Sequence, residues 1–220
     1  MNNLAVLTTA TPRAELFEEG LYPTLKFLSQ DFKLFWFVNL DAPPMLSLQD
    51  FEVAKSSILN FVKTNNIKGA LTTNTKTPNF GVAAQTVFKK ASASIPFDFY
   101  MWLEDDWKLE NETAYRIALY KYIEEEKDFL LSMRPYVCGN PFIFKHEFFK
   151  EVVEGYQDRA LDPELMFFYQ RQIQRNGKSK KTPEKNSIQA NYFVDIGRDW
   201  RANRKIIKQN KHKNPKNTWT

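Results

Sequence analysis

The sequence is poor in the residues on which several classes of protein depend. Its one cysteine, Cys138, lies in an apolar run, so there is no disulfide framework and no cysteine metal cluster, and we expect a buried thiol. Neither a GxxxxGKS/T loop nor a GxGxxG pattern occurs, which argues against P-loop and dinucleotide-binding enzymes. Of the two histidines, His146 is the first residue of an expected helix and His212 lies in a basic tail, so we expect surface or capping roles for both.

Long apolar runs are also absent. No stretch approaches the roughly 18 consecutive apolar residues that cross a bilayer, and the N-terminus lacks the basic start of a signal peptide. We therefore expect a cytoplasmic protein that starts near Met1. The 220 residues fit one domain, and 43% hydrophobic residues, among them 19 Phe, suffice for a packed core.

The net charge of +5 is unevenly distributed. Residues 175–220 carry a net charge of +10, whereas residues 1–174 carry −5. A basic segment of this kind can bind nucleic acid, an anionic membrane surface or the phosphates of a ligand. The alternative is a solvated end of the chain over residues 208–220. We expect a domain at residues 1–207 and a basic C-terminal tail at 208–220.

Apolar runs alternate with helical patterns along the chain. The runs predict strands at Leu4–Thr9, Leu34–Leu40, Lys68–Thr73, Phe97–Leu103, Tyr136–Phe144 and Asn191–Ile196. Helices are expected at Pro12–Ser29, Leu48–Asn65, Gly81–Ser92, Glu112–Lys127, His146–Glu154 and Pro163–Arg175. Thr11 and Asp162 each precede a proline, as N-cap residues do. Continuous apolar strands suit a largely parallel sheet, so we predict an α/β fold with ligands beyond the carboxyl ends of the strands.

Three consecutive carboxylates follow the fourth apolar run. In FDFYMWLEDDW, Glu104, Asp105 and Asp106 stand at what we expect to be a solvent-facing strand end. Side chains two apart on a strand point the same way, so Glu104 and Asp106 can converge on one Mg²⁺ or Mn²⁺ that bridges to a nucleotide diphosphate. The alternative is an acidic turn that caps the next helix. The strand-end position and the flanking tryptophans favour a binding site.

This apolar strand with its acidic triplet resembles the DxD region of GT-A glycosyltransferases. The resemblance implies a single Rossmann-like GT-A domain with a central, mostly parallel sheet flanked by helices. It makes Asp106 the direct metal ligand and places Asp105 among the nucleotide-binding residues. Glu104 stands where the family has its first Asp, and its partner is the metal, the ribose or a bridging water.

Earlier segments resemble the nucleotide-binding part of the same family. LAVLTTATPR resembles the first strand and its loop, with Thr8, Thr9 and Arg13 as contacts to base, ribose or diphosphate. Asn39 and Asp41 stand where the family places an amide or carboxylate against the base. Gly81 opens a helix of small residues beneath the donor. Turn chemistry and capping are the alternative roles for these residues.

Later segments resemble the acceptor side and the end of the metal site. Asn140 is positioned for a sugar hydroxyl, and Asp162 or Glu164 for the base that deprotonates the acceptor, with helix capping as the alternative. FVDIGRDWR resembles the family's His-Ile-Gly element, with Asp195 in the histidine position. Its arginines, Arg198 and Arg201, would neutralise the leaving diphosphate. The alternatives are a final strand with surface charges, and His212 as the third metal ligand.

The reaction implied is transfer of a sugar from a nucleoside diphosphate sugar, expected to be UDP-linked, to a hydroxyl acceptor with Mn²⁺ or Mg²⁺. One rival is a metal-dependent nucleotidyltransferase, which would release pyrophosphate. The other is a non-catalytic RNA- or surface-binding module built on the basic tail. Nucleic acid is not the expected partner.

Overall fold

A seven-stranded, mostly parallel sheet forms the centre of the molecule. The computed structural model describes residues 1–42, 46–74, 78–125, 127, 129–131, 141–155, 187–189 and 191–197. The strand order is β3-β2-β1-β4-β7-β6-β8, and β7 runs antiparallel to both of its neighbours. The strands are β1 (Asn3–Ala10), β2 (Lys33–Asp41), β3 (Lys68–Asn74), β4 (Phe99–Trp102), β6 (Phe129–Leu131), β7 (Phe142–Lys145) and β8 (Ser187–Gln189). The predicted α/β class is confirmed.

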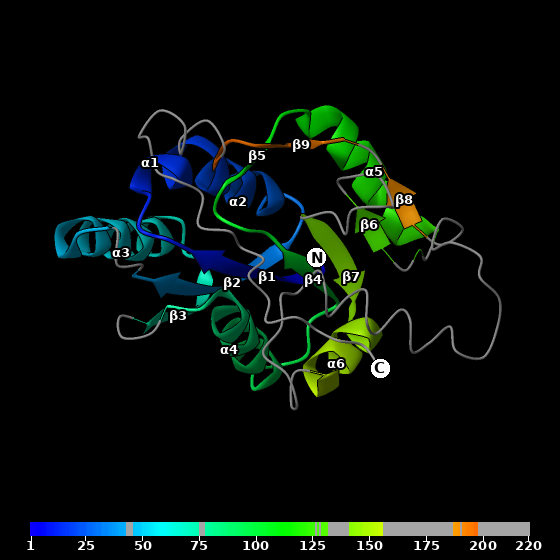
Figure 1. The fold of residues 1–220 in the computed structure, drawn as a ribbon. Coiled ribbons are helices and arrows are strands. Elements are labelled where there is room, and N and C mark those ends of the chain that lie inside the picture. Colours follow the sequence, from blue (N-terminus) through cyan, green and yellow to red (C-terminus); the bar gives the residue numbers. More distant parts are fainter. Residues whose placement is uncertain are drawn as a thin grey trace, which may run out of the picture.

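Helices cover both faces of this sheet (Figure 1). One layer holds α1 (Ala14–Leu16), the π-helical turn η1 (Phe17–Leu21), α2 (Tyr22–Leu28), α3 (Leu48–Thr64) and α5 (Glu112–Glu124). The other layer holds α4 (Phe80–Ser92) and α6 (His146–Gly155). Within the described part of the chain, none of these helices combines the length and the apolar character needed to span a membrane.

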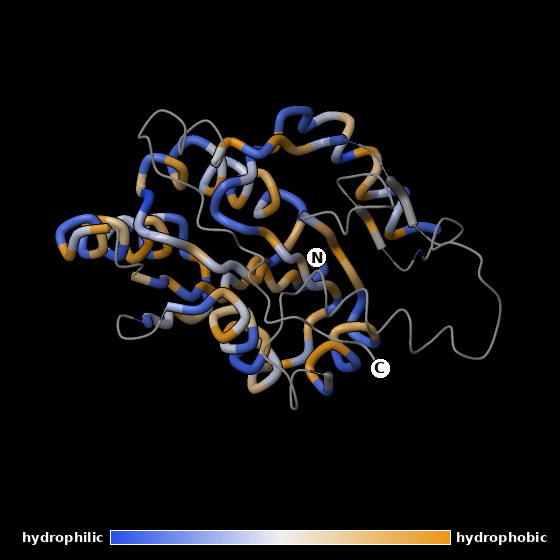
Figure 2. The backbone as a smooth tube through the Cα atoms, viewed as in Figure 1, coloured by the Kyte–Doolittle hydropathy of each residue, from blue (hydrophilic) through white to orange (hydrophobic). Residues whose placement is uncertain are grey.

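The alternation of side chains along β1 and β2 divides the core in two. Val6 and Trp36 belong to the cluster beneath α2, α3 and α5, whereas Leu7 and Phe37 belong to the cluster beneath α4 and α6. Helices α3 and α4 alternate between hydrophilic and hydrophobic residues along their length (Figure 2), as expected of helices with one face on a core. Burial on both faces explains why the strands appear in the sequence as unbroken apolar runs.

Side chains cap the starts of α3 and α4, which are not the capped starts that the sequence predicted. Ser47 and Asp50 form a capping box at α3, and Asn79 caps α4. Thr11 is not the cap that the sequence predicted, because the helix begins at Ala14 and Arg13 occupies the N-cap position without a side-chain cap bond. The predicted helix Pro12–Ser29 is built from α1, η1 and α2 in succession.

A second, two-stranded sheet joins the end of the described chain to the centre. The predicted strand Asn191–Ile196 forms as β9 (Phe193–Asp195), but it pairs with β5 (Trp107–Leu109) and not with the main sheet, which corrects our expectation. The backbone N–H of Ile196 donates to the carbonyl of Asp106 at 2.9 Å. This pairing places the FVDIG segment directly beside the acidic residues.

Candidate functional site

The acidic triplet lies at the carboxyl end of β4, in the middle of the sheet. Trp102 is the last residue of β4 and pairs with Leu7 of β1, and the next N–H, that of Leu103, donates to the carbonyl of Leu7 at 3.0 Å. Leu103 and Glu104 follow without regular structure, and Asp105 and Asp106 form a turn; residues 104–106 are called the acidic turn below. We predicted that Glu104 and Asp106 point the same way because side chains alternate along a strand. That argument does not apply to them, because β4 ends at Trp102.

Asp105 is anchored to the loop that follows β1. Its Oδ2 accepts hydrogen bonds from the backbone N–H of Thr11 at 3.0 Å and from the Thr11 hydroxyl at 3.3 Å. The Arg13 guanidinium donates to both carboxylate oxygens, from Nε to Oδ2 at 3.3 Å and from Nη2 to Oδ1 at 2.5 Å. Sequence reasoning missed the role of Thr11, because residues 11 and 105 meet only when β1 and β4 pair.

Asp106 lies on the other side of the same guanidinium. Its Oδ2 is 3.5 Å from Arg13 Nη1 and 3.4 Å from Nη2, which is longer than a typical charge-assisted hydrogen bond. Gly197 packs directly on the Asp106 side chain, so that a Cβ atom at position 197 would overlap the carboxylate. Asp105 and Asp106 are 3% and 4% exposed, so they are buried and not on the solvent-facing strand end that the sequence predicted.

Burial and opposite charges act against each other in this cluster. Burial alone would lower the pKa of the Arg13 guanidinium, but the charges of Asp105 and Asp106 raise that pKa above its usual value. Burial raises the pKa of Asp105, and the Arg13 charge and the Thr11 N–H both oppose that rise. Arg13 is therefore a permanent cation within a carboxylate cluster.

The residues present are chemically suited to a hard divalent cation, although their number is small. Mg²⁺ commonly takes one or two protein carboxylates and completes its coordination with phosphate oxygens and waters. Glu104 and Asp106 can supply two carboxylates of this kind. Among the residues that the structure describes, however, no three His, Cys, Asp or Glu side chains are grouped to hold a metal ion. The register places Asp195 opposite Trp107, next to the acidic turn, and His212 lies outside the described residues.

A second polar group lies at the carboxyl ends of the neighbouring strands. Thr9, Asn39 and Thr72 are aligned across β1, β2 and β3. Asn39 Nδ2 donates to Asp41 Oδ1 at 2.7 Å, and the Thr72 hydroxyl donates to Asn39 Oδ1 at 2.9 Å. Burial raises the pKa of Asp41 from 3.8 to about 6, although hydrogen bonds from Asn39 and from a backbone N–H at residue 79 oppose this rise.

Two other predicted residues occupy structural positions. Thr8 points to the opposite face from Thr9, is fully buried, and accepts a hydrogen bond from the indole Nε1 of Trp36 at 2.9 Å. Gly81 is buried in the first turn of α4, whose start at Asn79 lies against Asp41. Of the predicted site residues, Asn140, Asp162, Glu164, Arg198, Arg201 and His212 lie outside the described residues, as does Cys138.

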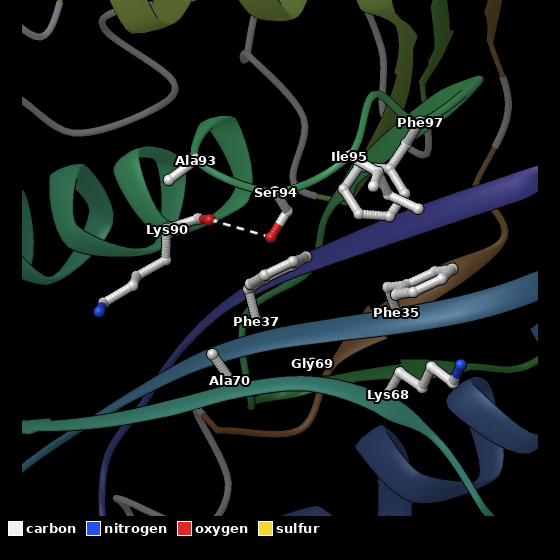
Figure 3. Close-up of a pocket in the computed structure, with 10 residues that line it drawn as sticks. All are labelled: Phe35, Phe37, Lys68, Gly69, Ala70, Lys90, Ala93, Ser94, Ile95 and Phe97. Atoms are coloured by element: carbon white, nitrogen blue, oxygen red, sulfur yellow. Dashed lines mark hydrogen bonds between the residues drawn. The ribbon is translucent and has the colours of Figure 1, made fainter.

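A hollow of about 730 Å³ lies toward the amino-terminal ends of β2 and β3 (Figure 3). Phe35 and Phe37 of β2 line it together with Phe97, and Lys68 and Lys90 stand at its rim. These residues come from the amino-terminal parts of β2 and β3, whereas the acidic turn follows the carboxyl end of β4. The hollow therefore does not belong to the candidate site.

Solved structures share this fold, whereas no protein-family model and no curated protein sequence matches the chain. The chain superimposes on 4-diphosphocytidyl-2C-methyl-D-erythritol synthase from Anaerococcus prevotii with a TM-score of 0.52 and 11% identity, over 90% of this chain and 92% of that one. A putative glucose-1-phosphate thymidylyltransferase from Bacillus anthracis gives 0.50 and 8%, over 87% and 90%.

Other solved structures match with TM-scores below 0.5, among them the mannosyltransferase PcManGT from Pyrobaculum calidifontis in complex with GDP-Man and Mn²⁺, with a TM-score of 0.45 and 12% identity over 68% of this chain and 46% of that one. TarS from S. aureus, residues 1–349 in complex with UDP, matches with a TM-score of 0.49 and 13% identity over 76% of this chain. The chain spans only 54% of the length of that TarS chain. At such identities the likeness shows the fold alone. The chain therefore shares its α/β fold with the synthase from Anaerococcus prevotii and the thymidylyltransferase from Bacillus anthracis.

Proposed function

We propose that the protein is a metal-dependent glycosyltransferase that moves a sugar from a nucleoside diphosphate sugar, UDP-linked, to a hydroxyl acceptor. The observation that carries this proposal is the position of the acidic turn. The acidic turn follows the central strand β4 and contacts the loop after β1. It therefore lies at the carboxyl ends of two parallel strands, where α/β proteins bind ligands.

In this proposal Asp106 and Glu104 hold Mn²⁺ or Mg²⁺, and Asp195 or His212 completes the site. When bound, the metal supplies positive charge to the departing diphosphate. Arg198 and Arg201 add donors to the same diphosphate. Asp162 or Glu164 takes the proton of the acceptor hydroxyl.

The group formed by Thr9, Asn39 and Asp41 is proposed to bind the base. An ionised Asp41 is an acceptor only, so it favours a base that presents an N–H, as uracil does at N3. Asn39 uses one amide hydrogen on Asp41 and its oxygen on Thr72, which orients the carboxylate. This arrangement is compatible with the uracil of UDP, whose N3–H can donate to Asp41.

Nucleotidyl transfer is the second candidate, because two solved structures with TM-scores of 0.52 and 0.50 are named a diphosphocytidyl-methylerythritol synthase and a thymidylyltransferase. The same carboxylates would then hold the metal for attack on a nucleoside triphosphate. The products distinguish the two reactions. A glycosyltransferase releases UDP from a UDP-sugar, whereas a nucleotidyltransferase releases pyrophosphate from CTP, UTP or dTTP and a sugar phosphate.

The test combines calorimetry with product analysis. We expect UDP to bind with Mn²⁺ and to bind weakly in excess chelator, because the acidic turn repels a bare diphosphate. A panel of UDP-sugars and GDP-sugars is then assayed for release of the diphosphate, and triphosphates for release of pyrophosphate. Asp106→Asn should lose metal-dependent binding, and Glu110→Gln, an exposed carboxylate in the same region, is the control.

Three outcomes contradict the proposal. Equal UDP affinity in chelator would remove the metal from the mechanism. Pyrophosphate release without diphosphate release would establish the nucleotidyltransferase. Salt-sensitive RNA or vesicle binding that survives Asp106→Asn, with no nucleotide binding, would establish the non-catalytic module.

A further inference from the structure

The carboxylate of Asp105 is buried, and the protein donates hydrogen bonds to both of its oxygens. A carboxylate offers about four lone-pair positions. Asp105 receives four hydrogen bonds, two from Thr11 and two from Arg13, at 2.5 to 3.3 Å. Three of these bonds are on Oδ2 and one is on Oδ1, and Asp105 is only 3% exposed. A metal ion or a ligand hydroxyl would have to displace one of these donors to reach Oδ2.

The guanidinium of Arg13 is likewise engaged in hydrogen bonds to Asp105 and Asp106. Its Nε and Nη2 form a fork on Asp105, and the guanidinium also reaches Oδ2 of Asp106. The side chain is 9% exposed. A planar guanidinium that donates two hydrogen bonds to one carboxylate fixes the orientation of that carboxylate as well as neutralising its charge. The ammonium group of a lysine cannot fix the orientation in this way.

The geometry ties the loop after β1 to the turn after β4. Because Asp105 and Asp106 are consecutive, fixing the first carboxylate fixes the backbone that carries the second. Arg13 and Gly197 then contact Asp106 from two sides. The direction of the Asp106 carboxylate is therefore set by residues far away in the sequence.

We propose that Thr11, Arg13 and Asp105 are positioning residues rather than ligand contacts: they hold the acidic turn on the loop after β1 and so orient Asp106 toward a divalent cation. This inference rests on the proposed function for the identity of the ion. It reassigns Arg13 and Asp105, which the sequence placed against the nucleotide, to a role that acts through Asp106.

A double-mutant cycle tests this assignment. The four proteins are the wild type, Arg13→Met, Asp105→Asn and the double variant, and the readout is Mn²⁺ affinity without nucleotide, from the electron spin resonance signal of the free ion. Loss of partners that orient a ligand typically costs about 10- to 100-fold in metal affinity, so we expect each single variant to lose that much. Because both variants break the same anchor, the double variant should lie within about twofold of the weaker single variant.

Two patterns would overturn the proposal. If Asp105→Asn and Arg13→Met lose affinity independently, so that the losses multiply in the double variant, then Asp105 is itself a ligand. If Arg13→Met weakens UDP binding but leaves Mn²⁺ affinity unchanged, then Arg13 contacts the diphosphate. Should Arg13→Met fail to fold, because it leaves a buried carboxylate unpaired, Arg13→Lys takes its place in the cycle.

The failure of the proposed function is a separate result. Coupled loss of Mn²⁺ affinity in a protein that releases no nucleoside diphosphate from any sugar donor supports the positioning role and refutes the glycosyltransferase. A wild-type protein that binds no Mn²⁺, either alone or with UDP present, overturns both.

Discussion

Asp41 offers a sharp test of the electrostatics of the candidate site. It is 7% exposed, and burial raises its pKa from 3.8 to about 6. The folded protein therefore holds the Asp41 proton more tightly than the unfolded chain does. Between pH 3.8 and pH 6 the folded state binds more protons, so wild-type stability falls as the pH rises through this window, and the penalty is complete above about pH 6.

The free-energy cost of ionising Asp41 follows from the shift in its pKa. Two pKa units at about 1.4 kcal/mol each give about 3 kcal/mol as an upper limit for the cost of ionising Asp41 in the folded protein. Asp41→Asn removes that cost, because an amide is neutral at every pH. It also turns an acceptor oxygen into a donor, which costs about 1 kcal/mol at all pH values.

The assay is urea unfolding of the wild type and Asp41→Asn at pH 4.0, 5.0, 6.0 and 7.5. We expect the free energy of unfolding of the variant, relative to the wild type, to rise by about 2 to 3 kcal/mol from pH 4.0 to pH 7.5. Glu110→Gln, which removes an exposed carboxylate, controls for net charge. A difference between Asp41→Asn and wild type that is the same at pH 4.0 and pH 7.5 would refute the reasoning.

Three further predictions concern the acidic turn and a helix start. Asp106→Asn should abolish Mn²⁺ binding while circular dichroism and the cooperative melt are retained, because the amide matches the carboxylate in shape; a protein without a cooperative melt would mean that Asp106 is structural. Gly197→Ala should weaken Mn²⁺ affinity by about 10-fold or more, because the new methyl group overlaps the Asp106 carboxylate, and unchanged affinity would show that this contact does not orient Asp106. Ser47→Ala should lower the free energy of unfolding by about 1 kcal/mol without changing nucleotide binding, because it removes the capping box of α3; loss of UDP binding would contradict a purely local role.

The order of strands and helices could be predicted because it depends on local patterns. Runs such as Leu34–Leu40 are long and unbroken, and they appear in the structure as β2 within one residue at either end. Short strands could not be found this way. Strands β6 and β8 have three residues each, too few for a periodic signal, and they form because neighbouring strands offer backbone partners.

The sequence by itself determined that a cluster of carboxylates follows a buried strand, and that a later FVDIG segment carries a fourth carboxylate. Tertiary structure alone decided what these groups touch. The strand ends at Trp102, so the triplet lies in a turn, and pairing of β1 with β4 brings Thr11 and Arg13 onto Asp105. Pairing of β5 with β9 in turn brings Gly197 onto Asp106. Hydrophobic periodicity is a local property of the chain, but hydrogen bonds between residues more than 90 positions apart exist only after the backbone has closed around them.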